Sequence, residues 1–280
     1  MRQLTGHVAV NGRITTADKA RISVFDRSYL YGDGLMEVMY AEAGEVVAAK
    51  LHLERLYAAA ERLGISLPWQ ASLLLVELRQ LASYYKSCYL RLTISSGIGV
   101  GVARKMQEAQ RTVICLPYRR SAALAPLTLR SKRRLTNFAN DIKTTNYLES
   151  IVALEATAPQ EDILWLNAQG MLTETAAANI FFFKQGEGFF TPATTGELLA
   201  GVTRQLVCRY LKGQGYAVYE RQIKYRELGG FNAAFITSSL QGVRLIQSID
   251  GQVFDTVVLR RLGEEFNLLP AAAVQDLSAR

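Results

Sequence analysis

Strand-type and helix-type hydrophobic patterns alternate along this 280-residue chain, in two blocks separated by residues 119–126. In the first block, HVAVNGRI and EVMYAEAGEVVAAK each predict a β-hairpin, because an Asn-Gly or Ala-Gly pair interrupts a run of strand-forming residues. Residues 51–64 and 71–85 have the spacing of amphipathic helices. YLRLTISSG and RTVICLPY are further strand patterns. This mixture predicts an α/β protein of the two-domain α+β type.

The second block repeats the mixture. Strand patterns occur in DILWLN, in AAFITSSL and in NIFFFKQGEGFFTP, the last of which predicts a hairpin. Helical patterns begin near Thr145 and cover VTRQLVCRYLKGQG and VVLRRLGEEFNLL. We therefore expect one domain at residues 1–118, a linker at 119–126 and a second domain at 127–280.

The composition excludes several classes of protein. Hydrophobic residues make up 49% and charged residues 20% of the chain, as in soluble globular proteins. No apolar run reaches the ~20 residues of a membrane helix, and the N-terminus lacks the apolar stretch of a signal peptide. The net charge of +7 comes from scattered basic residues without a nucleic-acid-binding motif, so we expect neither a membrane nor a nucleic-acid partner.

Cysteine and histidine usage indicates a cytoplasmic protein without a metal site. Cys88, Cys115 and Cys208 are far apart and odd in number, which favours reduced thiols over a disulfide framework. The chain has only 2 histidines and no CxxC or HExxH pattern, so metal binding has no support.

The residue that points to a chemistry is Lys143, in NDIKTTNYLES. A lysine just before a helix is by itself most often a solvated surface side chain. About thirty residues later, Glu174 lies in a predicted Thr-Glu-Thr turn before a very apolar strand. Val202 and Thr203 then open a helix, whose N-terminus presents free N–H groups and the positive end of the helix dipole to an anion.

A second anion-binding segment follows in FITSSLQG, where the hydroxyls of Ser238 and Ser239 suit phosphate oxygens. A lysine amine, a carboxylate and two phosphate-binding segments are the parts that an enzyme of pyridoxal 5′-phosphate (PLP) needs. The amine forms a Schiff base, the carboxylate keeps the pyridine nitrogen protonated, and the phosphate anchors the cofactor.

These segments, in this order, resemble the class IV aminotransferases, which are PLP enzymes of fold type IV. The resemblance covers nearly the whole chain, through FDRSYLYGDGLMEVMYAEAGEV, LHLERLYAAAERL, DIKTTNYL, LTETAAANIFFF, LAGVTRQ and FITSSLQGV. It implies that Lys143 carries the cofactor and is the catalytic residue, that Glu174 holds the pyridine nitrogen, and that Leu199 lies against the ring. The phosphate-binding residues that it implies are Arg55, Val202, Thr203, Ser238 and Ser239.

Several of these residues have plainer alternatives. Arg55 could form an i,i+4 ion pair on the surface of its helix. Glu174 could be a carboxylate that only stabilises a turn, and Thr203 an ordinary residue of a first helical turn.

The resemblance also implies an architecture. Family members have a smaller N-terminal α/β domain and a larger C-terminal domain, with PLP between them, and are usually homodimers. We therefore expect residues near Arg27 or in the Gly97–Val102 loop to cross a dimer interface.

The reaction and its substrates are less fully specified by the motifs. The family includes D-amino acid aminotransferases, branched-chain aminotransferases and aminodeoxychorismate lyases. The spacing in KTTNYL fits the first and third groups, and YGDGLMEV and HLERLYAAAERL are most similar to the D-amino acid enzymes. However, SSGIGV lacks the Arg-x-His pair of those enzymes. Glu37 stands where some lyases have a threonine, and Gly242 stands where aminotransferases often have an acidic residue.

We predict an aminotransferase that moves an amino group from an amino acid, with D-amino acids favoured, to a 2-oxo acid. The alternatives are an aminodeoxychorismate lyase, which releases pyruvate and yields 4-aminobenzoate, and a branched-chain L-amino acid aminotransferase. A PLP-fold protein that binds anions without turnover is a further possibility, against which Lys143 and Glu174 argue.

The substrate carboxylate needs a cation, for which arginine is the natural bidentate partner. Arg91 interrupts the apolar strand YLRLTIS, on the face of Tyr89 and Thr93. Arg27 is close in sequence to Tyr31, which the resemblance places at the substrate. We hypothesise that Arg27 and Arg91 bind the α-carboxylate. In the alternative, Arg91 pairs with a carboxylate of the core and Arg27 with one in its loop.

Overall fold

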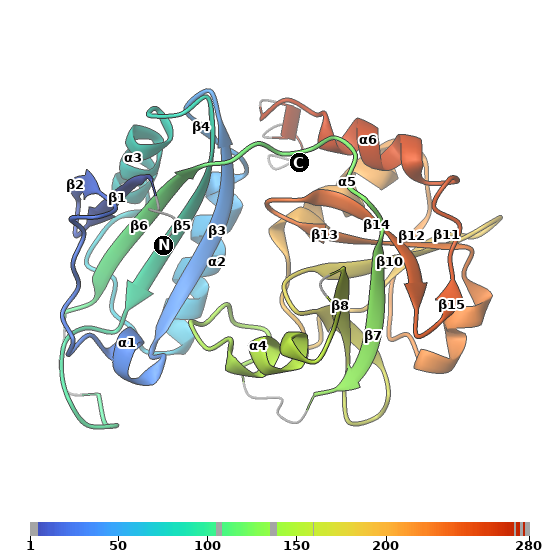
Figure 1. Cartoon of the computed structure of the whole chain (residues 1–280), viewed down its shortest axis with the longest axis horizontal. Coiled ribbons are helices and arrows are strands. Elements are labelled where there is room, and N and C mark those ends of the chain that lie inside the picture. Colours follow the sequence, from blue (N-terminus) through green and yellow to red (C-terminus); the bar gives the residue numbers. More distant parts are fainter. Residues whose placement is uncertain are drawn as a thin grey trace. The chain divides into compact units, whose positions relative to one another are not determined.

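The computed structural model describes residues 5–104, 108–134, 139–158, 160–271, 273, 274 and 277. The chain forms two compact units (Figure 1). The first contains Met1–Arg119, Ile142–Asn146 and Ala271–Ser278, and the second contains Arg120–Asp141, Tyr147–Pro270 and Ala279–Arg280. The short segment around Lys143 therefore belongs to the first unit, although the residues on either side of it belong to the second.

A six-stranded sheet with the order β2-β1-β6-β5-β3-β4 forms the first unit. All of its neighbouring strands are antiparallel. The strands are β1 (His7–Val10), β2 (Arg13–Thr16), β3 (Gly34–Glu42), β4 (Glu45–Val46), β5 (Ser87–Ser95) and β6 (Gln110–Pro117), and the helices are α1 (Arg27–Tyr31), α2 (Ala49–Arg62) and α3 (Ala71–Ala82).

The two faces of this sheet differ in burial. Along β5, Cys88, Leu90, Leu92 and Ile94 are fully buried, while the residues between them are half-buried. Successive side chains of a strand point to opposite faces, so one face is the core of the unit. Helix α2 packs on β3, and α3 packs on β5 and β6.

Both predicted hairpins of the first block are confirmed. Asn11 and Gly12 have φ angles of 49° and 85°, and Ala43 and Gly44 have φ angles of 50° and 80°. Two consecutive residues in the left-handed region match the twist of the flanking strands, which is why an Asn-Gly pair is a strong hairpin signal.

The second unit is built on a nine-stranded sheet with the order β12-β11-β10-β13-β14-β7-β8-β9, with β15 paired to β14. Because β9 also pairs with β10, the strands from β10 to β9 close into a ring. The strands are β7 (Leu127–Arg133), β8 (Glu161–Leu166), β9 (Leu172–Thr175), β10 (Asn179–Lys184), β11 (Gly188–Thr191), β12 (Val218–Glu220), β13 (Ala233–Ser238), β14 (Gly242–Ile249) and β15 (Gln252–Val253).

Side chains of this ring form one apolar core that includes Leu129, Ile180, Phe182, Ile236 and Ile246. The helices of the unit are α4 (Leu148–Glu155), α5 (Val202–Gly213), the 3-10 helix η1 (Tyr225–Gly230) and α6 (Arg260–Asn267). Helix α5 packs on β13, and α6 packs on β14. The predicted α/β fold with mixed sheets and helices is confirmed.

Two local predictions are wrong. The helix expected to begin near Thr145 begins at Leu148, after Tyr147, because residues 142–146 extend beside β3. The predicted Thr-Glu-Thr turn is strand β9, which pairs with β8 and β10 and buries all four of its residues.

The three cysteines are buried free thiols. None of the helices within the described ranges combines the length and apolar character that a membrane span requires.

Candidate active site

Lys143 is fixed by backbone pairing with β3. The Met36 N–H donates to the Lys143 carbonyl at 2.9 Å, and Thr144 lies opposite Leu35 as in an antiparallel pair. The Thr145 N–H and hydroxyl extend this pairing, since they donate to Gly34 O at 3.0 Å and to Gly32 O at 2.7 Å. Lys143 itself is half-buried, which differs from the fully solvated surface lysine that its sequence position alone favours.

Arg55 does not form an i,i+4 pair on its helix. Its Nε and Nη2 atoms donate to the two carboxylate oxygens of Glu37 at 2.8 and 2.7 Å. Glu37 is only 1% exposed, and its Oε2 also accepts from Nδ1 of the buried His52 at 2.6 Å. Paired, bidentate charges of this kind are held in a narrow range of geometries. The candidate phosphate-binding arginine is therefore oriented by a buried carboxylate.

The protonation states of this cluster follow from its geometry. Burial by itself raises the pKa of Glu37, but the charge of Arg55 and the contacts with His52 lower it to about 2. Burial lowers the pKa of His52; Glu37 opposes that shift, and the charges of Arg55 and Lys143 reinforce it. Glu37 is thus ionised and His52 neutral near pH 7, and the charge of Lys143 acts on His52.

In the second unit, polar groups converge at the start of α5. The helix begins at Val202 after Gly201, and no side chain caps its first turn. The Thr203 hydroxyl lies 3.5 Å from the Ser239 hydroxyl, which comes from the turn after β13. Uncapped N–H groups beside two hydroxyls suit a phosphate group. Ser238 differs from Ser239, because its hydroxyl accepts the Gln241 N–H at 3.3 Å and so closes its own turn.

Glu174 is a buried strand residue and not a turn carboxylate. Its Oε2 accepts the Leu199 N–H at 3.1 Å, and the Leu199 carbonyl accepts from Asn179 at 2.9 Å. Its Oε1 lies 3.4 Å from Nη1 of Arg134, whose guanidinium is 4.9 Å from the centre of the Trp165 ring. Sequence reasoning missed Arg134, although its position in the basic run before Lys143 was visible.

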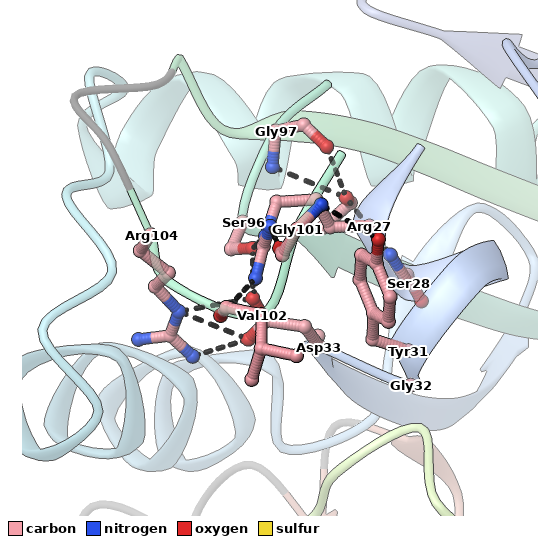
Figure 2. A network of polar contacts seen from close by, with 12 residues as sticks. Arg27, Ser28, Tyr31, Gly32, Asp33, Ser96, Gly97, Gly101, Val102 and Arg104 are labelled. Atoms are coloured by element: carbon pink, nitrogen blue, oxygen red, sulfur yellow. Dashed lines mark hydrogen bonds and ion pairs between the residues drawn. The ribbon is translucent and has the colours of Figure 1, made fainter. Parts of the chain in front are cut away.

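Arg27 and Tyr31 lie together in the first unit, but Arg27 is enclosed by protein groups. Its side chain is 2% exposed and pairs with Asp33 at 2.9 Å (Figure 2). This contact is the alternative in which Arg27 pairs with a carboxylate of its own loop. Its hypothesised binding of substrate stays a prediction.

Arg91 has a different environment. It is half-buried on the face of the sheet opposite the core, with Nε 3.4 Å from the Thr93 hydroxyl, which is the predicted face. Across the described residues, no carboxylate lies within ion-pair distance of Arg91. An arginine without a counter-ion is suited to an anionic ligand.

The sequence of residues 34–249 matches the model of the family described as amino-transferase class IV. The chain belongs to this family. The predicted resemblance is therefore confirmed. Class IV aminotransferases depend on PLP.

Relatives of this class IV aminotransferase have different activities. It is 28% identical over 273 residues to a putative branched-chain-amino-acid aminotransferase of Methanocaldococcus jannaschii, covering 92% of this chain and 94% of that one. A D-alanine aminotransferase of Bacillus licheniformis is 27% identical over 258 residues, with 88% and 89% covered. The crystal structure of a putative 4-amino-4-deoxychorismate lyase from Legionella pneumophila superposes with a TM-score of 0.80, at 26% identity, over 88% of this chain and 94% of that one.

Each unit, taken by itself, carries groups of the kinds that bind parts of PLP. The first unit of this class IV aminotransferase carries Lys143 and the oriented guanidinium of Arg55. The second carries Glu174 and, at the start of α5, the uncapped N–H groups of Val202 and Thr203 with the nearby Ser239 hydroxyl. The amine suits the aldehyde of PLP, and the buried carboxylate suits its pyridine nitrogen. The cation and the uncapped helix start suit its phosphate.

Proposed function

We propose that this protein transfers the amino group of an amino acid to a 2-oxo acid, with PLP held on Lys143 and D-amino acids as the favoured donors. The observation that carries the proposal is the half-buried Lys143, anchored to β3 within electrostatic range of the Glu37–His52–Arg55 cluster. PLP supplies an electron sink for the substrate when it is bound.

The chain's own residues then have separate tasks in this proposal. Lys143 Nζ takes the proton from the substrate α-carbon and acts as the general base. Glu174 would bind the pyridine nitrogen through its carboxylate. Arg55 would bind the cofactor phosphate, and Thr203 and Ser239 are further proposed phosphate-binding residues. Arg91 binds a substrate carboxylate.

The preference for D-amino acids has support from two sources. YGDGLMEV and HLERLYAAAERL are most similar to the D-amino acid enzymes, and a D-alanine aminotransferase is a relative at 27% identity. The branched-chain alternative has comparable support from a relative at 28% identity.

One sequence argument for the lyase, the glycine at position 242, has an explanation that does not depend on the reaction. Gly242 stands where aminotransferases often have an acidic residue, but its φ angle is 66° and a Cβ atom there would lie 2.0 Å from Oδ1 of Asn267. Backbone conformation and packing therefore require glycine at this position, whatever the reaction. The 26% identical putative lyase keeps this activity as the second candidate.

One spectroscopic experiment tests these alternatives. The purified protein, loaded with PLP, should absorb visible light, and Lys143→Ala should abolish that band. D-alanine or D-glutamate should bleach the wild-type band, and a 2-oxo acid should restore it. Bleaching by L-leucine alone would indicate a branched-chain enzyme. Release of pyruvate from aminodeoxychorismate, with no bleaching by any amino acid, would establish the lyase.

We also propose that the enzyme is a homodimer that buries an apolar patch of the first unit. Phe25 and Tyr29 near α1 and Ile98, Val100 and Val102 in the following loop are exposed. The Gly99 N–H donates to the Phe25 carbonyl at 2.9 Å, so these two segments are adjacent. An exposed apolar patch of this kind is typical of a protein interface.

Light scattering tests the dimer. Val100→Asp should convert dimers to monomers, while Val253→Asp on β15, where the side chain is equally exposed, should not. A monomeric wild-type protein at micromolar concentration would contradict the proposal.

We further propose that the enzyme works in the cytoplasm, since its three cysteines are free thiols.

A further inference from the structure

The guanidinium of Arg27 is surrounded by acceptors of the first unit. Nε donates to Asp33 Oδ2 at 2.9 Å and to the Ser96 hydroxyl at 3.2 Å. Nη1 donates to the Gly101 carbonyl at 2.6 Å, and Nη2 donates to the Val102 carbonyl at 3.0 Å. Figure 2 shows these partners around the side chain. Each of the three nitrogens thus binds the protein itself, and two of them bind the loop after β5.

Asp33 binds a second arginine at the far end of the same loop. Nε of Arg104 lies 3.0 Å from both oxygens of Asp33, and its Nη2 also contacts Oδ1. The Ser96 hydroxyl donates to Oδ2 at 2.6 Å. One carboxylate therefore joins α1 to both ends of the loop at residues 97–104 (Figure 2). We call Arg27, Asp33, Ser96 and Arg104 the Asp33 clamp.

The Asp33 carboxylate at the centre of this clamp keeps its negative charge. Burial by itself raises the pKa of Asp33, but hydrogen bonds from Arg104, Ser96 and Arg27 hold it well below the usual carboxyl range. Asp33 therefore stays ionised, and the clamp intact, at any pH where an ordinary carboxyl group is ionised.

The loop that the clamp holds is intrinsically flexible. Gly97, Gly99 and Gly101 alternate along it, and glycine has more backbone freedom than any other residue. The loop therefore depends on contacts from outside it for a single conformation. The carbonyls of Gly101 and Val102 accept such contacts from Arg27.

The same contacts fix Tyr31. The Gly101 N–H donates to the Tyr31 hydroxyl at 2.8 Å, and the Arg27 guanidinium lies 5.0 Å from the centre of the Tyr31 ring. Tyr31 is still 41% exposed, so part of its ring remains available. The orientation of Tyr31 thus depends on two contacts. The Arg27 guanidinium lies over the face of its ring, and the loop binds its hydroxyl.

We propose that Asp33, acting through Arg27 and Arg104, is a positioning residue that holds Tyr31 and the loop at residues 97–104 in the conformation that receives the substrate. This inference rests on the proposed function for the role of Tyr31. Arg27 then has an indirect role: it shapes the substrate side of the site without binding the carboxylate.

The test compares Asp33→Asn with wild type and with Asp18→Asn, an exposed aspartate of the same unit, in PLP-loaded protein. Asparagine keeps the size of the side chain but lacks the charge that pairs with both arginines. Hydrogen exchange should become at least about tenfold faster at the amides of Gly99 and Gly101. The half-saturating concentration for bleaching by an amino acid donor should rise about tenfold or more, with the maximal rate changed by less than about threefold.

Two further variants distinguish loss of the clamp from a general loss of folding. Arg104→Gln removes the more exposed arginine of the clamp, and Tyr31→Phe removes only the acceptor of the Gly101 N–H. Both should accelerate exchange at Gly101 and raise the half-saturating concentration, while the visible band of bound PLP is unchanged. Asp18→Asn should alter neither quantity.

The outcomes separate this inference from the proposed function. Unchanged exchange in Asp33→Asn and Arg104→Gln would overturn the clamp. Faster exchange with an unchanged half-saturating concentration would overturn its positioning role. If wild-type protein bleaches with no amino acid, the proposed function fails, the positioning of a donor fails with it, and exchange alone then decides whether the clamp orders the loop.

Discussion

Arg55 donates from Nε and Nη2 to the two carboxylate oxygens of the buried Glu37, at 2.8 and 2.7 Å. The pair links α2 to β3, so the helix that presents the candidate phosphate-binding arginine is locked to the strand beside which Lys143 runs. Arg55, which the family resemblance predicts to bind the cofactor phosphate, is thus also part of the architecture that positions Lys143.

Replacing Glu37 should therefore destabilise the fold. Glu37→Gln leaves the half-buried guanidinium of Arg55 facing a buried neutral amide, and breaking the pair in this way should lower the free energy of unfolding by roughly 2–3 kcal/mol at pH 7. Urea unfolding measures this change. Glu54→Gln, on the exposed side of α2, should change it by less than about 0.5 kcal/mol, as for surface pairs. Equal effects of the two substitutions would contradict the account.

The advantage of wild type over Glu37→Gln should depend on pH in a defined direction. Folding lowers the pKa of Glu37 from 4.5 to about 2. The stabilisation is therefore complete above the unfolded value, and it is lost as the pH falls through the folded value, because the unfolded chain takes up the proton first. The difference in unfolding free energy should be constant from pH 7 to pH 5 and shrink below about pH 4.5. A difference that grows in acid would exclude this assignment.

His52 should contribute a pH dependence of the same sign, but closer to neutrality. Burial lowers its pKa from the ordinary value of 6.5, so the unfolded chain takes up a proton that the folded chain does not. Wild-type stability should consequently fall as the pH drops from 7 to 5. His52→Gln, which can still donate to Glu37, should show a smaller decrease over this interval. A parallel series with His7→Gln, at the half-buried histidine of β1, provides the control.

Arg134 should influence cofactor binding through Glu174. Arg134→Met keeps an apolar side chain near Trp165 but removes the cation beside the buried Glu174 carboxylate. The Kd for PLP should rise about tenfold, equivalent to about 1.4 kcal/mol. Equilibrium dialysis measures it, with Arg133→Met at the neighbouring exposed arginine as the matched control. Identical Kd values for the two variants would disprove the role.

Arg91 should matter for the donor and not for the cofactor. Arg91→Met should raise KM for amino acid donors by roughly 10- to 100-fold, since one charged bidentate contact is worth about 1.5–3 kcal/mol. The visible band of bound PLP should be unchanged. Arg13→Met on β2 is the control, because Arg13 is exposed and distant in the sheet order. If KM is the same in both variants, another cation binds the carboxylate.

The sequence predicted local elements well where a local signal decides them. The Asn11-Gly12 turn and the helix at residues 51–64 are examples, since turn geometry and apolar spacing are properties of neighbouring residues. Strand β9 was missed because three of its four residues are polar and become buried only when the ring closes on β10. No property of Leu172–Thr175 alone reports that closure.

The candidate site likewise combines features that the sequence motifs predict with contacts between distant residues that they do not. Motif order identified Lys143, Glu174 and Arg55 as cofactor residues, a role that remains a prediction. The contacts of Arg27 were not readable, because its partners Gly101 and Val102 lie 74 and 75 residues further along the chain. The bidentate partner of Arg55 is 18 residues away and on another element, so helical spacing suggested the wrong kind of ion pair.

The pairing of residues 142–146 with β3 has a consequence for dissecting this protein. A fragment ending at Arg119 would contain all six strands of its sheet and yet lack the segment that receives the Met36 N–H and donates to Gly34. The outer edge of β3 at Gly34–Met36, beyond its pairing with β4, would then be unprotected and open to pairing with other molecules. Expression of the first unit as a truncated gene should yield an aggregating product, and supplying residues 142–146 by circular permutation or as a peptide is the rational remedy.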